Sequence, residues 1–199
     1  MKNWKYIFRL IGILIGFVIL SCSSDDDNGN QQPTVAGELI VNGQTYDLIK
    51  GFIIPNYTGT DPNYNPRRFY FILTNGDVTL NNNDFVYSNS ITQLIDFNMY
   101  SSISSSGSVE NTSYTVYDPT DTNFDFDSAY IDHSGINTNV VIQNNQYVSS
   151  DSISSDDLEG QATISENNGI YTISFSFSNS QNTISGTFTG SLTDLNYQY

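Results

Sequence analysis

The 199-residue chain is poor in the residues that build covalent and metal frameworks. It contains one cysteine, Cys22, and one histidine, His133. A single cysteine excludes an internal disulfide, and a single histidine excludes a metal site with several imidazole ligands. The sequence also lacks Cys-x-x-Cys, His-Glu-x-x-His and the glycine-rich loop that cradles phosphates.

Basic residues are also scarce, with six Lys and Arg against 21 Asp and Glu. Three of the six, Lys2, Lys5 and Arg9, precede every acidic residue, so the chain after residue 21 has three basic residues and a net charge of −18. A surface this acidic repels phosphates instead of releasing their counterions. We therefore expect neither a nucleic-acid partner nor electrostatic binding to an anionic membrane.

One long apolar run occurs, at residues 10–20, and it is broken only by Gly12 and Gly16. As a helix its eleven residues rise only ~16 Å, about half of a ~30 Å hydrocarbon core. Together with the basic residues before it, the run predicts a removable export signal over residues 1–21, not a transmembrane helix.

The export signal ends in Ile19-Leu20-Ser21-Cys22, which resembles the lipobox of bacterial lipoproteins. The resemblance implies that Cys22 is lipidated, becomes the mature N-terminus and anchors the protein in a membrane. Several acyl chains at ~0.8 kcal/mol per buried CH₂ would make that anchor effectively permanent. The alternative is an ordinary signal peptide followed by a chance cysteine.

An acidic cluster, Ser23-Ser24-Asp25-Asp26-Asp27, follows the cysteine. It resembles the surface-export signal of lipoproteins in the Bacteroidota, which implies the outer membrane and a position facing the cell exterior. Residues 22–37 are also too polar to bury a core, so they are predicted to form a flexible tether whether or not they carry a signal.

Residues 38–199 are predicted to form a single all-β domain. In residues 170–178, Tyr171, Ile173, Phe175 and Phe177 share one face and Ser or Thr the other, a period of two that no helix gives. Asn168-Gly169 before them is a strong hairpin signal. About ten short strands predict an antiparallel β-sandwich or a small calycin-like barrel. Besides the three C-terminal ones, strands are predicted at residues 38–41, 45–54, 68–74, 84–87, 93–100, 113–117, 124–131 and 139–148.

The C-terminal stretch from Gly186 to Leu192 is similar to the final strands of small calycin-like or β-sandwich lipoproteins of the Bacteroidota. Most of those proteins have no known activity, so this resemblance implies a fold and not a function.

The longest break in the strand pattern, at residues 55–68, is a candidate ligand site. It contains Tyr57, Tyr64, Arg67 and Arg68. Tyrosine rings can stack on sugar C–H groups while polar side chains bind the hydroxyls, so these four residues predict a glycan site. The alternative is an ordinary surface loop in which the arginines offset neighbouring acidic residues.

A second candidate is a calcium site at Asp121, Asn123 and Asp125, which stand at the first three ligand positions of an EF-hand loop. Phe126 occupies the position that requires glycine, so an EF-hand is excluded and only an irregular site is possible. The alternative is a strand with Phe124 and Phe126 inward and the aspartates in water. Calcium is the one cofactor considered.

Two groups contain catalytic residue types, Asp132-His133-Ser134 and the carboxylates of Asp156, Asp157 and Glu159. Adjacency in sequence does not create a triad, and paired carboxylates must face each other across a cleft. We therefore expect a non-enzymatic, lipid-anchored surface protein that binds a glycan or an envelope protein. The alternatives are a structural or assembly lipoprotein without a small ligand and an Asp/Glu-dependent secreted hydrolase.

Overall fold

Strands with one apolar face stack in two layers in the computed structural model, which describes residues 36–55, 67–105, 108–154 and 158–197. All regular elements in these segments are β-strands, so the predicted all-β class is confirmed. Within the same segments, no helix is long and apolar enough to cross a membrane.

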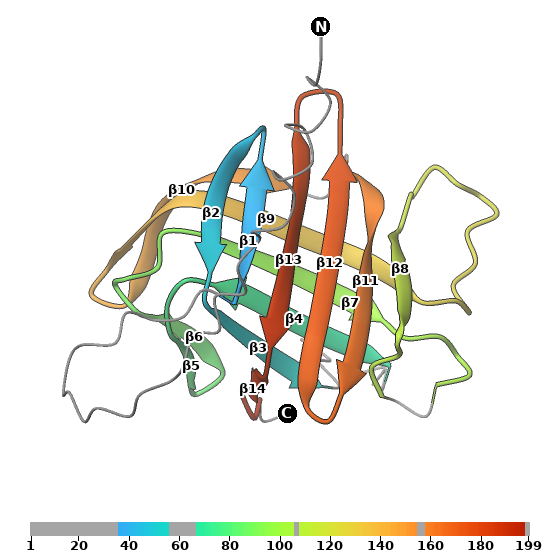
Figure 1. Cartoon of the computed structure of the whole chain (residues 1–199), viewed down its shortest axis with the longest axis horizontal. Helices are drawn as coiled ribbons and strands as arrows, with labels where there is room; N and C mark the ends of the chain where they lie inside the picture. The colour runs from blue at the N-terminus through green and yellow to red at the C-terminus, as the bar shows by residue number, and fades with distance from the viewer. Residues whose placement is uncertain (1–35, 56–66, 106–107, 155–157, 198–199) are drawn as a thin grey trace, which may run out of the picture. The chain divides into compact units, whose positions relative to one another are not determined.

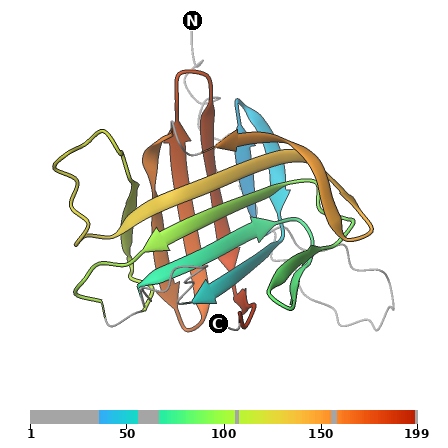
Figure 2. The same ribbon diagram turned by 180° about the vertical axis from the view of Figure 1, so that it is seen from behind.

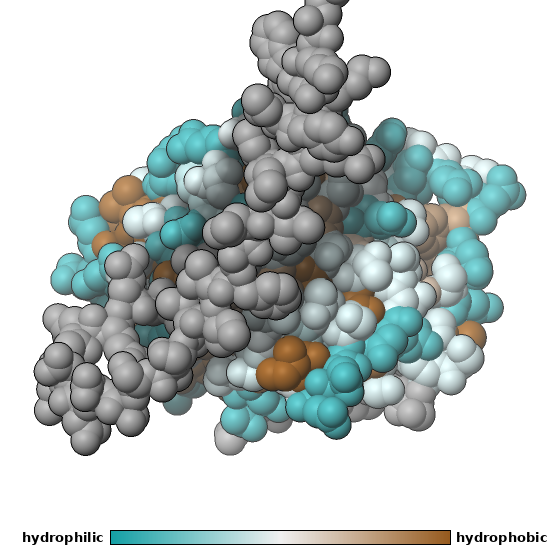
Figure 3. Space-filling view, viewed as in Figure 1, coloured by the Kyte–Doolittle hydropathy of each residue, from teal (hydrophilic) through white to brown (hydrophobic). Residues whose placement is uncertain are grey.

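The front layer in Figure 1 contains the C-terminal meander predicted from the sequence. Its strands, in spatial order, are β2 (Gln44–Leu48), β1 (Gly37–Val41), β13 (Thr183–Gly190), β12 (Ile170–Ser178), β11 (Glu159–Asn167) and β8 (Thr112–Val116). Ile173, Phe175 and Phe177 of β12 are buried, whereas the Ser and Thr residues that alternate with them are exposed. The pale surface to the right of the grey trace in Figure 3 belongs to this hydroxyl-rich face.

The back layer is seen from its outward side in Figure 2. Its strands are β14 (Leu192–Asp194), β3 (Lys50–Pro55), β4 (Arg68–Thr74), β7 (Leu94–Tyr100), β9 (Tyr130–Gln143) and β10 (Gln146–Ser154). The long strand β9 pairs with β7 on one edge and with β8 and β10 on the other, which joins both layers into one curled sheet. Two pairs, β8–β9 and β3–β14, are parallel where only antiparallel pairing was expected.

Two apolar cores stabilise this arrangement. The main core lies between the layers and includes Phe71 of β4 and Phe175 of β12. A second core lies on the outward side of the back layer, where a hairpin of β5 (Val78–Asn81) and β6 (Asp84–Tyr87) packs near Ile72 and Ile142. The back layer is therefore apolar on both faces at this end, which explains why β4 reads as a continuous apolar run.

Asparagines at positive φ set the turns and redirect two of the predicted strands. Asn42-Gly43 and Asn168-Gly169 have positive φ at both positions, as type I′ hairpins require. The strand predicted at residues 139–148 is instead a hairpin, because it turns at two asparagines with φ of 52° and 62°. The strand predicted at residues 45–54 ends at Leu48 and resumes at Lys50, since the chain passes there from the front layer to the back layer.

Candidate functional site

Polar side chains occupy the centre of the outward face of the back layer. Ile95 and Met99 of β7 belong to the main core, so the alternating residues Asp96, Asn98 and Tyr100 face outward. β7 lies between β4 and β9 (Figure 2), whose outward residues flank these three. We define the outer-face strip as Arg68, Tyr70, Asp96, Asn98, Tyr100, Asp132 and His133.

Asp96 is the one acidic side chain among the described residues that is buried. Burial raises the pKa of its carboxyl from 3.8 to about 6, while His133 and hydrogen bonds from the Tyr70 hydroxyl and the Gly135 backbone act in the opposite direction. Gly135 provides the space that the carboxylate occupies, because a Cβ at this position would lie 2.5 Å from Asp96 Oδ1.

Asn98 connects the two sides of the strip. Arg68 Nε donates to Asn98 Oδ1 at 2.8 Å, and Asn98 Nδ2 donates to Asp132 Oδ2 at 3.3 Å. Asp132 reaches this position because the register shifts by one residue between Asn98 and Met99, which makes Asp132 the extra residue of a β-bulge. Bulges re-aim side chains in this way next to functional sites.

The two arginines predicted from the sequence lie at one end of the strip. Arg67 Nη1 donates to the backbone oxygen of Ser101 at 2.9 Å, and the Arg68 guanidinium lies 5.7 Å from the centroid of the Tyr100 ring. Tyr100 in turn stacks on Tyr130, with centroids 4.8 Å apart and planes 7° apart. Arg68 is therefore held by an amide oxygen and by a cation–π contact at the same time.

Tyr130 links this stack to a cluster of four aromatic rings. The rings of Tyr117, Phe124, Phe126 and Tyr130 are all in mutual contact, with centroid distances from 4.9 to 6.5 Å. Burial, with smaller contributions from Tyr100 and Asp132, raises the pKa of the Tyr130 hydroxyl to about 12. Phe126 remains 49% exposed, so the cluster presents one open ring to a ligand.

The strand predicted at residues 124–131 is wrong, because β9 begins only at Tyr130. Asp121 Oδ1 accepts from the Asn123 backbone N–H at 2.9 Å, and Asp125 Oδ1 accepts from the Asp127 N–H at 3.0 Å. These Asx turns compete with a β-ladder for the backbone donors. The segment is therefore a loop that the aromatic cluster holds against the domain.

The same turns bear on the predicted calcium site at Asp121, Asn123 and Asp125. The Oδ1 atoms of both aspartates already accept backbone hydrogen bonds. Among the described residues, no group of three or more His, Cys, Asp or Glu side chains is arranged to hold a metal ion. The calcium site remains a sequence-based prediction without structural support.

The catalytic residue types do not converge in the described segments. His133 pairs in register with the outward Asn98, whereas Ser134 pairs with Phe97 and is buried on the core side. Asp132, His133 and Ser134 therefore do not form a triad. Ser134 therefore faces the core, and its Oγ has no hydrogen-bond partner among the described residues.

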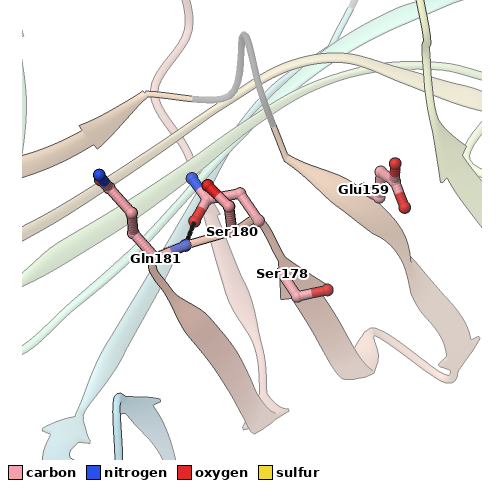
Figure 4. Close-up of a pocket in the computed structure, with 5 residues that line it drawn as sticks. Glu159, Ser178, Ser180 and Gln181 are labelled. Carbon is pink, nitrogen blue, oxygen red and sulfur yellow. Dashed lines mark hydrogen bonds between the residues drawn. The ribbon is translucent and has the colours of Figure 1, made fainter.

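Surface pockets away from the outer-face strip are lined mainly by polar residues. One of about 620 Å³ is lined by Glu159, Ser178, Asn179, Ser180 and Gln181. In Figure 4 the Glu159 carboxylate lies apart from Ser180 and Gln181, and the turn is closed by the Gln181 N–H donating to Asn179 Oδ1 at 2.9 Å. Asp156 and Asp157, predicted to pair with Glu159, lie outside the described residues.

Several other predicted site residues also lie outside the described residues. They are Cys22, Ser23, Ser24, Asp25, Asp26 and Asp27 of the N-terminal segment and Tyr57 and Tyr64 of the 55–68 loop. The structure therefore places Arg67 and Arg68 of the predicted glycan site and leaves its two tyrosines as predictions.

Sequence reasoning missed Asp96 and Asn98, although a signal for them exists. Both interrupt an otherwise apolar strand at alternate positions, in Leu94-Ile95-Asp96-Phe97-Asn98-Met99. Aspartate is rarely buried without partners, so an aspartate within such a run indicates a specific polar environment. The bulge that brings Asp132 to Asn98 has no comparable signature in the sequence.

The strip thus combines fixed hydrogen-bonding groups with aromatic rings on a rigid sheet. Carboxylates accept, guanidinium groups donate and amides do both, which suits recognition of a ligand rich in hydroxyl groups. Comparison of the chain with models of known families, with curated proteins and with solved structures finds no match.

Proposed function

We propose that this protein is a non-enzymatic, lipid-anchored protein of the outer cell surface that binds a glycan at the outer-face strip. One observation carries the proposal: Arg68, Asn98 and Asp132 form a continuous hydrogen-bonded row beside the aromatic cluster, whose Phe126 ring is exposed. Polar groups beside an aromatic surface are what a sugar requires, since its hydroxyls need hydrogen bonds and its C–H face needs an apolar contact.

The row is already organised before a ligand binds. Asn98 is buried and fixes both Arg68 and Asp132, so these two side chains lose little conformational freedom on binding. Asp132 and His133 are exposed, so a ligand can reach the row from solvent. Preorganised side chains on strands support binding better than side chains on free loops.

The charge around the strip favours an uncharged glycan. Phe126, the exposed ring of the aromatic cluster, stands between Asp125 and Asp127, and both aspartates are exposed. The chain after residue 21 also carries a net charge of −18. An anionic glycan would be repelled at long range, whereas a neutral one would not.

The test is a glycan array probed with the detergent-solubilised full chain. Asp132→Ala removes one accepting carboxylate from the row and should weaken binding about tenfold, as expected for one hydrogen bond to a charged group. Asp84→Ala, which removes an exposed carboxylate at the start of β6, is the matched control and should bind like the parent. If Asp132→Ala binds every positive glycan as tightly as the parent does, the strip is not the site.

A second candidate function, assembly with an envelope protein, is supported by a different surface. Val141, Tyr147 and Val148 of the β9–β10 hairpin are 40–54% exposed. Apolar and aromatic groups of this kind are enriched in protein interfaces. Crosslinking on intact cells would test this candidate: Val148→Asp should abolish a crosslinked species that the parent forms, and an unchanged crosslinking pattern would contradict it.

A further inference from the structure

The β5–β6 hairpin is attached to the domain by side chains rather than by a β-ladder. Among the described residues, β5 and β6 pair only with each other. Val78 of β5 belongs to the second core, and Phe85 and Tyr87 of β6 pack against it. The hairpin therefore covers part of the outward face of the back layer without extending the main sheet.

The segments on either side of the hairpin are anchored more firmly. Thr74 Oγ1 donates to the Gln93 backbone oxygen at 2.7 Å, and the Thr92 backbone N–H donates to Asn75 Oδ1 at 3.0 Å. Lys50 forms a salt bridge with Asp77, the residue directly before β5. A movement of the hairpin would thus be confined to the residues between these anchors, roughly 78–91.

Aromatic side chains connect the hairpin to Asp96. Phe85 lies 5.8 Å from the Tyr70 ring and 6.1 Å from the Tyr87 ring, measured between centroids. The Tyr70 hydroxyl donates to Asp96. Burial and then the charge of Asp96 raise the pKa of Tyr87 to about 12, so Tyr87 also lies within electrostatic reach of this carboxylate.

The ionisation of Asp96 and the opening of the β5–β6 hairpin should therefore be coupled. Asp96 is only 8% exposed, and Tyr70, which donates to it, packs against Phe85 of the hairpin. Lifting the hairpin would remove this packing and open a path for water to the carboxylate. We propose that the β5–β6 hairpin is a pH-controlled cover, closed while Asp96 is protonated and opening more often once Asp96 is ionised. This device does not depend on what the outer-face strip binds.

The groups that face Asp96 come from each neighbouring strand. They are Tyr70 of β4, Tyr87 of β6, His133 of β9 and, through Tyr87, Tyr147 of β10. The charge of His133 acts on Asp96 as well, because it lowers the pKa of this carboxyl. A His133→Gln variant isolates the effect of Asp96, because the pH dependence should persist without the imidazole.

The sign and size of the effect follow from linkage. The closed form holds the proton with a pKa of about 6, and an open, hydrated Asp96 approaches its ordinary value of 3.8. Opening therefore becomes easier as pH rises through this interval and levels off above pH 6. Full hydration of the open form would increase the opening equilibrium about 50-fold between pH 4 and pH 7.

Hydrogen exchange of the full chain in detergent measures this opening. An isolated two-stranded hairpin is marginal in water, so the amides of β5 and β6 should exchange when it lifts. Their protection factors, corrected for the intrinsic rate at each pH, should fall tenfold or more from pH 4 to pH 7 in the wild type. They should stay level in Asp96→Asn, in which no charge develops at this position.

Two controls keep the test decisive. Asp84→Asn removes a carboxylate from the hairpin itself and should retain the wild-type pH dependence. Tyr70→Phe removes a hydrogen bond that favours ionised Asp96, so it should move the midpoint of the transition to higher pH. If the exchange of β5 and β6 has the same pH dependence in Asp96→Asn and in the wild type, or if Tyr70→Phe leaves the midpoint unchanged, the proposal is wrong.

Discussion

Replacing Asp96 with asparagine should stabilise the domain at neutral pH. The wild-type carboxyl is buried and its pKa is raised from 3.8 to about 6. A raised pKa of an acid means that the folded state favours the neutral form, so its stabilising contribution is complete below pH 3.8 and is lost as pH rises to about 6. A difference of about two pKa units corresponds to about 3 kcal/mol.

The assay is urea unfolding of wild type and Asp96→Asn between pH 4 and pH 8, followed by far-UV circular dichroism because the only tryptophan, Trp4, precedes the domain. The free energies of unfolding should agree at pH 4, where Asp96 is neutral. The variant should then become more stable by up to about 3 kcal/mol by pH 7. Comparing the two proteins at each pH cancels the changes that the other carboxylates cause. Parallel pH profiles for the two proteins would refute the assignment of Asp96 as a destabilising buried charge.

Three further predictions concern the anchor, the tether and the sheet. Cys22→Ala should abolish labelling by radioactive palmitate, and equal labelling of the variant would rule out lipidation at this residue. Replacing residues 25–27 with alanine should protect the protein from extracellular protease on intact cells, and shaving at the wild-type rate would show that the cluster is only a spacer. Gly186→Ala should lower the free energy of unfolding by about 2 kcal/mol, because its Cβ would lie 2.3 Å from the Glu38 backbone oxygen. Gly190→Ala, whose nearest neighbour would be at 3.2 Å, should cost less when both are measured by urea unfolding.

The sequence predicted the front layer well because its strands have one dry face. A period of two, as in β12, fixes both the strand type and which residues are buried. The burial pattern of the back layer was harder to predict, since β4 is buried on both faces at one end and its apolar and polar residues do not alternate there. β5 (Val78–Asn81) was not among the predicted strands, although its partner β6 was.

The candidate site was only partly predictable for a related reason. Arg67 and Arg68 were singled out because basic residues are rare in this chain. Their contacts with Ser101 and Asn98 join positions about thirty residues apart, and sequence alone does not reveal such tertiary contacts. Phe124 and Phe126 alternate as a strand would, but local hydrogen bonds by the intervening aspartate turned the segment into a loop instead.

The pairing of β1 with β13 has a consequence for the order in which the chain can fold. Gly37 pairs with Phe188, so this contact joins residues 151 positions apart. At ~5–20 residues per second, a ribosome needs about 8–30 s to complete that interval. Until then the β1–β2 hairpin has no neighbouring strand, and an isolated hairpin is marginal in water. Such a non-local topology folds in about milliseconds to seconds once its last strand is available. The β1–β2 edge of the front layer therefore forms only after β13 has been made, and until then these two strands lack their partner in the sheet.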